Sequence, residues 1–89
     1  MLIGKVIGSV VSTRKHEGLV GLKLLIIRPL NSRSRHQDLV AVDNIGAGTG
    51  ETVLVTTGSS ARLVLNNPQA PVDAAVVGIV DNPAGVSSG

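Results

Sequence analysis

The sequence predicts an all-β fold, a small closed or nearly closed barrel of five strands with one short helix. Val and Ile dominate five short stretches, as is typical of strands that lie on a half-buried pleated surface. Gly, Pro and polar clusters separate these stretches, as expected of turns. Closure into a barrel is expected because it removes open sheet edges, which so small an apolar sheet could not otherwise protect.

The five strands are expected at residues 2–13, 20–28, 39–45, 52–57 and 74–80. Gly4 and Gly8 interrupt one face of the first strand, and a glycine inside a strand marks a bend or a close approach of two backbones. Pro29 ends the second strand, because proline cannot donate to a strand ladder. The polar segment 29–38 follows as a mobile loop. Five short strands with one helix are typical of the oligonucleotide/oligosaccharide-binding (OB) type of barrel.

A short helix is expected between the last two strands. Gly58 breaks the fourth strand, Ser59 or Ser60 caps the free backbone donors, and residues 61–65 form the helix. The segment 66–68, Asn-Asn-Pro, stops it. We expect one domain over residues 1–81 and a fraying tail over residues 82–89.

The composition argues against several classes of protein. The absence of Cys removes disulfides, thiolate metal sites and thiol catalysis, and the absence of Phe, Trp and Tyr removes the surfaces on which single-stranded nucleic acid stacks. A net charge of +2 is too small to indicate a polyanionic partner. No apolar run approaches the roughly 20 residues of a membrane span, and the first residues lack the order of a secretion signal. We therefore expect a cytoplasmic protein with neither a membrane nor a nucleic-acid partner.

The predicted core is thin. Its side chains are aliphatic, and each buried Val or Leu contributes only about 1.5–3 kcal/mol, which is marginal against chain entropy. Without disulfides or metal ligands, association of several copies is the expected remedy.

The charges are distributed unevenly along the chain. Residues 1–37 carry seven basic groups and one acidic group, a net +6, whereas residues 38–89 carry one basic group and five acidic groups, a net −4. Such an asymmetry is consistent with a solvated surface of no special role. It is also consistent with a ring assembled head to tail, in which two different patches meet and opposite charges fix their orientation.

The most distinctive segment is a glycine-rich loop, which consists of Gly46, Ala47, Gly48, Thr49, Gly50 and Glu51. Its spacing does not match the dinucleotide fingerprint, and no Gly-Lys-Ser/Thr follows, so a tight loop or a loop packed at a subunit junction is favoured over a phosphate cradle. Asp43 and Glu51 flank the glycines and could form an acid/base pair. Turn capping and surface solvation explain both residues more simply.

No catalytic, cofactor-binding or metal-binding constellation is predicted. Ser59 and Ser60 lie in a Gly-Ser-Ser-Ala segment, which is not the Gly-x-Ser-x-Gly elbow of serine hydrolases. His16 and His36 do not form a His-Glu-x-x-His motif. We therefore expect a protein that is not an enzyme and that has no cofactor.

The order and spacing of several blocks resemble the CcmL/EutN family, the vertex proteins of bacterial microcompartment shells. The resemblance covers about residues 1–81. The blocks that carry it are residues 4–8 with 12–15, then 21–25, 42–51, 58–62, 71–75 and 78–81.

This resemblance implies an OB-like barrel that assembles into a cyclic pentamer. Such pentamers cap the vertices of a polyhedral shell and supply curvature to flat sheets of hexameric shell proteins, so the expected partners are further copies and those hexamers. The glycine-rich loop is then expected near the fivefold axis, where Glu51 and small residues shape a narrow opening. The residues expected at the subunit interface are Asp43, Ser59, Ser60, Arg62 and Asp73.

Two other functions remain as alternatives. An OB-type module that binds single-stranded nucleic acid would account for the barrel and the basic first half, although aromatic residues are absent. A small enzyme or ligand-binding barrel would use Asp43 and Glu51, although no complete catalytic set accompanies them.

Overall fold

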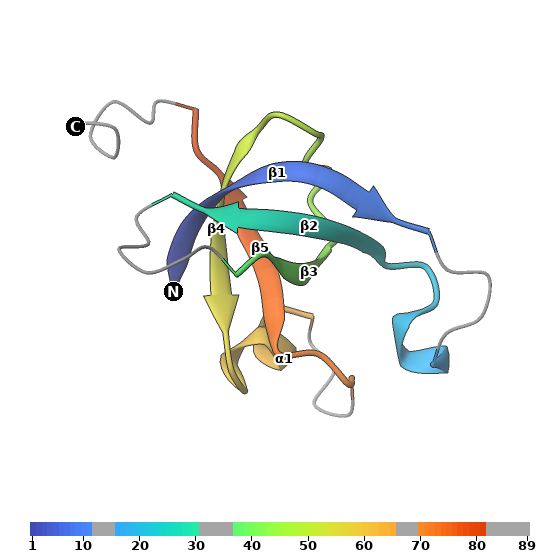
Figure 1. Cartoon of the computed structure of the whole chain (residues 1–89). Coiled ribbons are helices and arrows are strands. Elements are labelled where there is room, and N and C mark those ends of the chain that lie inside the picture. Colours follow the sequence, from blue (N-terminus) through green and yellow to red (C-terminus); the bar gives the residue numbers. More distant parts are fainter. Residues whose placement is uncertain (12–15, 31–36, 66–69, 82–89) are drawn as a thin grey trace.

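The structure is a computed structural model that describes residues 1–11, 16–30, 37–65 and 70–81. Its five strands are β1 (Leu2–Val10), β2 (Lys23–Pro29), β3 (Leu39–Asp43), β4 (Thr52–Thr57) and β5 (Ala74–Ile79). A 3₁₀ helix, η1 (Glu17–Leu19), precedes β2, and the helix α1 (Ser60–Val64) lies between β4 and β5. The predicted all-β class with one short helix is confirmed (Figure 1).

The strands close into a barrel in the order β1-β2-β3-β5-β4. All neighbours are antiparallel except β3 and β5, which run parallel and share one register pair, Val42 with Ala75. The glycine-rich loop lies before β4 and α1 follows it, so the two occupy opposite ends of the barrel (Figure 1).

Strand β1 bends between its two neighbours, as its glycines predict. The register with β2 shifts between Val6 and Gly8, which is a β-bulge. At Gly4 the backbone of β2 comes so close that an added Cβ would lie against the side chain of Ile27 and 3.0 Å from the carbonyl oxygen of Arg28. Only a glycine fits there without a shift of its neighbours.

The interior of the barrel is aliphatic throughout, as the composition predicts. Leu25 and Ile27 are its largest fully buried side chains, and the valines and alanines around them complete the inner cluster. A second cluster lies outside the barrel wall and contains Val42, Ala61 and Ala75. It packs α1 and the segment 70–72 against the strands, so that the helix covers one end of the barrel.

Several predicted element ends are wrong by one to three residues. Strand β2 begins at Lys23 rather than at residue 20, because η1 and a turn at Gly21, with a φ of +85°, take up the preceding residues. It also includes Pro29, which pairs with Gly4. β3 ends at Asp43 and β5 at Ile79.

The structure tests the remaining predictions for the ends and connections only in part. β4 has its predicted bounds, and α1 runs from Ser60 to Val64 rather than over residues 61–65. Val11 lies outside β1, whereas residues 12–13 of the predicted first strand fall outside the described residues, as do the Asn-Asn-Pro stop, most of the loop 29–38 and the tail. None of the helices among the described residues has the length and hydrophobicity that a membrane span requires.

Candidate functional site

Asp43, the last residue of β3, fixes the first half of the glycine-rich loop. Its Oδ1 accepts a hydrogen bond from the amide of Ile45 at 2.8 Å, and its Oδ2 accepts one from the amide of Ala47 at 2.8 Å. The amide of Gly46 donates to both oxygens, at 3.3 and 3.2 Å. The turn-capping role predicted for Asp43 is therefore confirmed. The expected surface solvation is wrong, because the residue is only 3% exposed.

Glu51 fixes the second half of the loop. Its Oε1 accepts from the amide of Gly48 at 2.6 Å, and its own amide donates to the carbonyl of Gly48 at 3.1 Å. Strand β1 holds the loop from the side: the amide of Gly50 donates to the carbonyl of Val6 at 2.8 Å, and the amide of Val6 donates to the carbonyl of Glu51 at 2.9 Å. The φ angles of Gly46 (+104°) and Gly50 (+92°) explain why glycine occupies these two positions.

Ala47 connects the loop to the barrel interior. Its side chain is fully buried within the inner cluster. Its carbonyl oxygen accepts a hydrogen bond from Lys23 Nζ at 3.0 Å. The loop thus closes one end of the barrel, while Thr49, Gly50 and Glu51 stay exposed on its outer side.

This geometry argues against two chemical interpretations of the loop. The amides of residues 45–48, 50 and 51 all donate within the chain, whereas a phosphate cradle needs free N–H groups. The carboxylates of Asp43 and Glu51 would also repel an anion. Asp43 is buried with both oxygens engaged by amides, so it is not available as an acid or base toward a substrate.

The other predicted site residues lie where β4 meets α1. Gly58, with a φ of +72°, ends β4, and its amide donates to the carbonyl of Asp73 at 2.7 Å. This bond places Asp73 beside the start of α1. Ser59, Ser60, Arg62 and Asp73 are all exposed. The structure thus brings these four residues to one end of the barrel and leaves Asp43 with the glycine-rich loop.

The predicted capping of α1 by serine is wrong. Ser59 stands at the N-cap position but already has helical angles, φ −64° and ψ −21°, and its side chain makes no capping hydrogen bond. Ser60 is itself the first helical residue. Backbone carbonyls satisfy the first donors instead: the amide of Ala61 donates to Gly58 at 3.1 Å, and that of Arg62 donates to Ser59 at 3.2 Å.

Sequence reasoning missed an apolar groove on the outside of the barrel. Its volume is about 140 Å³, and its lining comes from η1, β2, β3 and the segment 71–74. It is lined by Leu19, Leu24, Val40, Val42, Pro71, Val72, Asp73 and Ala74. Val40 is 50% exposed on β3, and its alternation with the buried Ala41 was the available sequence signal. The groove joins three separate segments of chain, which no local pattern reveals.

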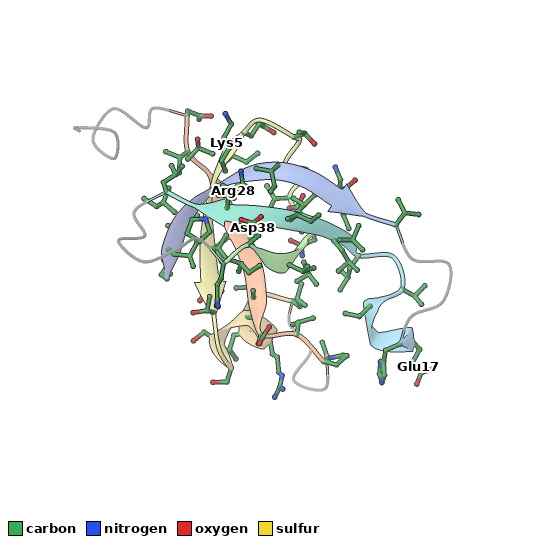
Figure 2. All side chains as sticks on the ribbon, viewed as in Figure 1. Lys5, Glu17, Arg28 and Asp38 are labelled. Carbon is green, nitrogen blue, oxygen red and sulfur yellow. The ribbon has the colours of Figure 1, made fainter. Side chains whose placement is uncertain are left out.

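An ion pair on the barrel surface was also not predicted. Arg28 on β2 donates to both carboxylate oxygens of Asp38, at 3.1 and 3.0 Å (Figure 2). The hydrogen bond and the charge of Asp38 raise the pKa of the Arg28 guanidinium above its ordinary value. Lys5 stands directly opposite Arg28 across the β1–β2 pair, so Asp38 offsets a contact between like charges.

The described residues contain no group of three His, Asp or Glu side chains that is placed to hold a metal ion. His16 Nδ1 accepts a hydrogen bond from the amide of Gly18 at 2.9 Å, which gives this ring a local structural role. His36 lies outside the described residues.

Comparisons with known proteins agree with the resemblance found in the sequence. The family model described as ethanolamine utilisation protein EutN/carboxysome matches residues 1–81. A relative from Rhodospirillum rubrum, the bacterial microcompartment shell vertex protein GrpN, is 51% identical over 91% of this chain and 93% of its own length. The shell vertex protein PduN of Salmonella typhimurium is 47% identical over 91% of this chain and 96% of its own length.

Solved structures extend the likeness to three dimensions. The ethanolamine utilization protein EutN superposes with a TM-score of 0.83 at 46% identity and covers 91% of this chain and 86% of its own. The GrpN pentameric microcompartment shell protein of Rhodospirillum rubrum superposes with a TM-score of 0.78 at 49% identity, over 92% and 95% of the two chains. The described barrel, the match of the family model over residues 1–81 and these relatives lead to one conclusion: this chain belongs to the EutN/CcmL family.

Proposed function

We propose that this chain is a structural shell protein that forms pentamers at the vertices of a polyhedral bacterial microcompartment in the cytoplasm. The main support for this proposal is the structural match with a solved pentameric shell protein, which covers 92% of this chain and 95% of that protein's chain. The curated relatives GrpN and PduN are named shell vertex proteins. The role is structural rather than enzymatic, and these relatives do not favour the nucleic-acid alternative.

The packing of the barrel supports assembly. The largest fully buried side chains are Leu25 and Ile27, so the barrel lacks the large aromatic area that usually stabilises so small a domain. Several apolar side chains remain outside, Val40 and Leu63 among them, at 50% and 79% exposure. Contact with other copies would bury such surface and add stability that the single barrel lacks.

Native mass spectrometry of the purified chain tests the ring. We expect a species of about 45 kDa, which is five times the 9.0 kDa of one copy. A chain that stays folded and monomeric at micromolar concentration would contradict the proposal.

We also propose a binding partner for the pentamer. It is a sheet of hexameric shell proteins, to which the pentamer would supply curvature. Co-expression with such hexamers tests this role. With the chain present we expect closed polyhedra by electron microscopy, and without it open sheets or tubes. Equal closure in both samples would contradict the vertex role while leaving the ring intact.

We further propose that the glycine-rich loop, residues 46–51, lies near the fivefold axis, where Glu51 shapes a narrow opening. The exposed outer side of the loop and its small residues support this position, because crowding at an axis favours Gly and Ala. Asp43 would act there indirectly, through the shape it gives the loop. Ser59, Ser60, Arg62 and Asp73, exposed at the other end of β4, remain the residues that we propose for direct subunit contact.

Gly48→Arg tests the axial position of the loop. Gly48 lacks a positive φ, and an added Cβ would meet Glu51 Oε1 at an ordinary 3.5 Å, so the single barrel tolerates a side chain there. Near an axis, five arginines would crowd together, and we expect loss of the pentamer by native mass spectrometry. Intact pentamers and closed shells would show that the loop lies elsewhere. Gly48→Ala is the matched control.

A further inference from the structure

The apolar groove is large enough to hold one side chain. Its volume of about 140 Å³ is similar to that of a dry protein cavity that accepts a benzene-sized group. Leu24 on β2 and Val40 and Val42 on β3 line it from two neighbouring strands, and Leu19 and Val72 line it from η1 and the segment 71–74. Asp73 also lines the groove and is exposed. The groove is therefore an apolar hollow beside a carboxylate.

Helix α1 exposes a large apolar side chain. Ala61 is fully buried, and Val64 packs against the outer cluster, so the helix is anchored by that side. Leu63 projects from the helix with 79% of its surface exposed, and Arg62 beside it is also exposed. The helix therefore carries an apolar projection next to a guanidinium.

The charges of these two surfaces are opposite. Among residues 1–11, 16–30, 37–65 and 70–81, neither Arg62 nor Asp73 has an ion-pair partner. Leu63 with Arg62 beside it is therefore complementary to the apolar groove, whose lining includes Asp73. Opposite charges across such a contact fix its register and discourage other pairings.

The symmetry of a closed ring indicates that a second copy of this chain occupies the groove. A closed ring repeats a contact between two different patches of one chain, whereas a twofold dimer presses the same patch against itself. Two grooves pressed together would leave an unfilled apolar void. A groove that faces the projection of the next copy leaves none.

We propose that Leu63 of one copy occupies the groove of its neighbour, with Arg62 facing the neighbour's Asp73, and that this contact repeats around the ring. The inference rests on the proposed ring and identifies the surfaces that form it.

Cross-linking between the two surfaces tests the contact directly. The chain has no cysteine, so a Leu63→Cys, Val40→Cys double variant carries two unique thiols. A short bifunctional maleimide should yield a ladder of linked copies on denaturing gels, up to the full ring. The matched control is Leu63→Cys with Val11→Cys, because Val11 is 89% exposed but does not line the groove. A ladder no stronger than that of the control would overturn the inference.

Charge reversal gives a second test that does not depend on one variant folding well. Arg62→Asp and Asp73→Arg should each raise the protomer concentration at half-assembly by about tenfold, because like charges then meet. The double variant should return it to within about threefold of the original. Single variants that assemble normally, or a double variant no better than the singles, would overturn the inference.

These outcomes separate the inference from the proposed function. If the unaltered chain is a ring and the contact tests fail, the ring uses other surfaces and the vertex role stands. If the unaltered chain forms no ring, the proposed function fails first, and a cross-linked ladder or a charge rescue cannot appear.

Discussion

At the scale of residues, the glycine-rich loop owes its shape to two carboxylates that bond its backbone. Asp43 accepts from three successive amides, and Glu51 accepts from Gly48. The residue type of Asp43 predicted a turn cap. Its burial could not be predicted, because it depends on Ala47 entering the barrel, which no local pattern specifies.

Removing the buried carboxylate should destabilise the protein. Asp43→Ala leaves the amides of Ile45, Gly46 and Ala47 without their acceptor, and the amide at the buried Ala47 has no access to water. We expect a loss of about 1–3 kcal/mol in the free energy of unfolding. Urea unfolding at one fixed protomer concentration measures it.

Glu51→Ala is the control for this change. Glu51 is exposed, so water replaces its bond to Gly48 and the expected loss is below about 1 kcal/mol. Equal losses in the two variants would contradict the role assigned to Asp43.

At the scale of elements, the strands were predictable and several of their ends were not. Val and Ile patterns located all five strands, because a half-buried surface favours those residues. The ends depend on contacts between distant segments. β3 stops at Asp43, whose side chain bonds the next turn, and β2 starts late because η1 contributes Leu19 to the outer cluster. The groove was missed for the same reason.

The turn that joins β4 to α1 depends on the left-handed backbone of Gly58. Its φ is +72°, and an added Cβ would meet nothing within 4 Å. Gly58→Ala therefore isolates the backbone penalty, and we expect a loss of about 1–2 kcal/mol. The measurement is the melting temperature of Gly58→Ala compared with that of Gly48→Ala, because the backbone of Gly48 lacks a positive φ. Equal melting temperatures would show that this turn rearranges freely.

At the scale of the whole molecule, we expect the thin barrel to couple folding to assembly. An aliphatic core without aromatic residues leaves little stability to the single copy, while contact between copies would bury Val40 and Leu63. The family and the fold could both be predicted from the sequence. The surfaces of contact could not, because they depend on side chains brought together by folding.

Coupled assembly should make the melting temperature depend on protein concentration. A ring dissociates as it unfolds, so higher protomer concentration favours the folded state by mass action. We expect calorimetric melting temperatures to rise by several degrees over a hundredfold increase in concentration. A melting temperature that stays constant over this range would show that single copies are stable alone.

The parallel contact between β3 and β5 has a consequence for how copies of this chain accumulate. One register pair, Val42 with Ala75, completes the cylinder, so this seam has the fewest paired residues in the wall, and we expect local opening to begin there. Val42 and Ala74 beside this seam also line the groove. A neighbouring copy bound in the groove would therefore stabilise the seam from outside. An isolated copy would then unfold locally at this seam and become accessible to proteases, whereas a copy within the ring would be protected.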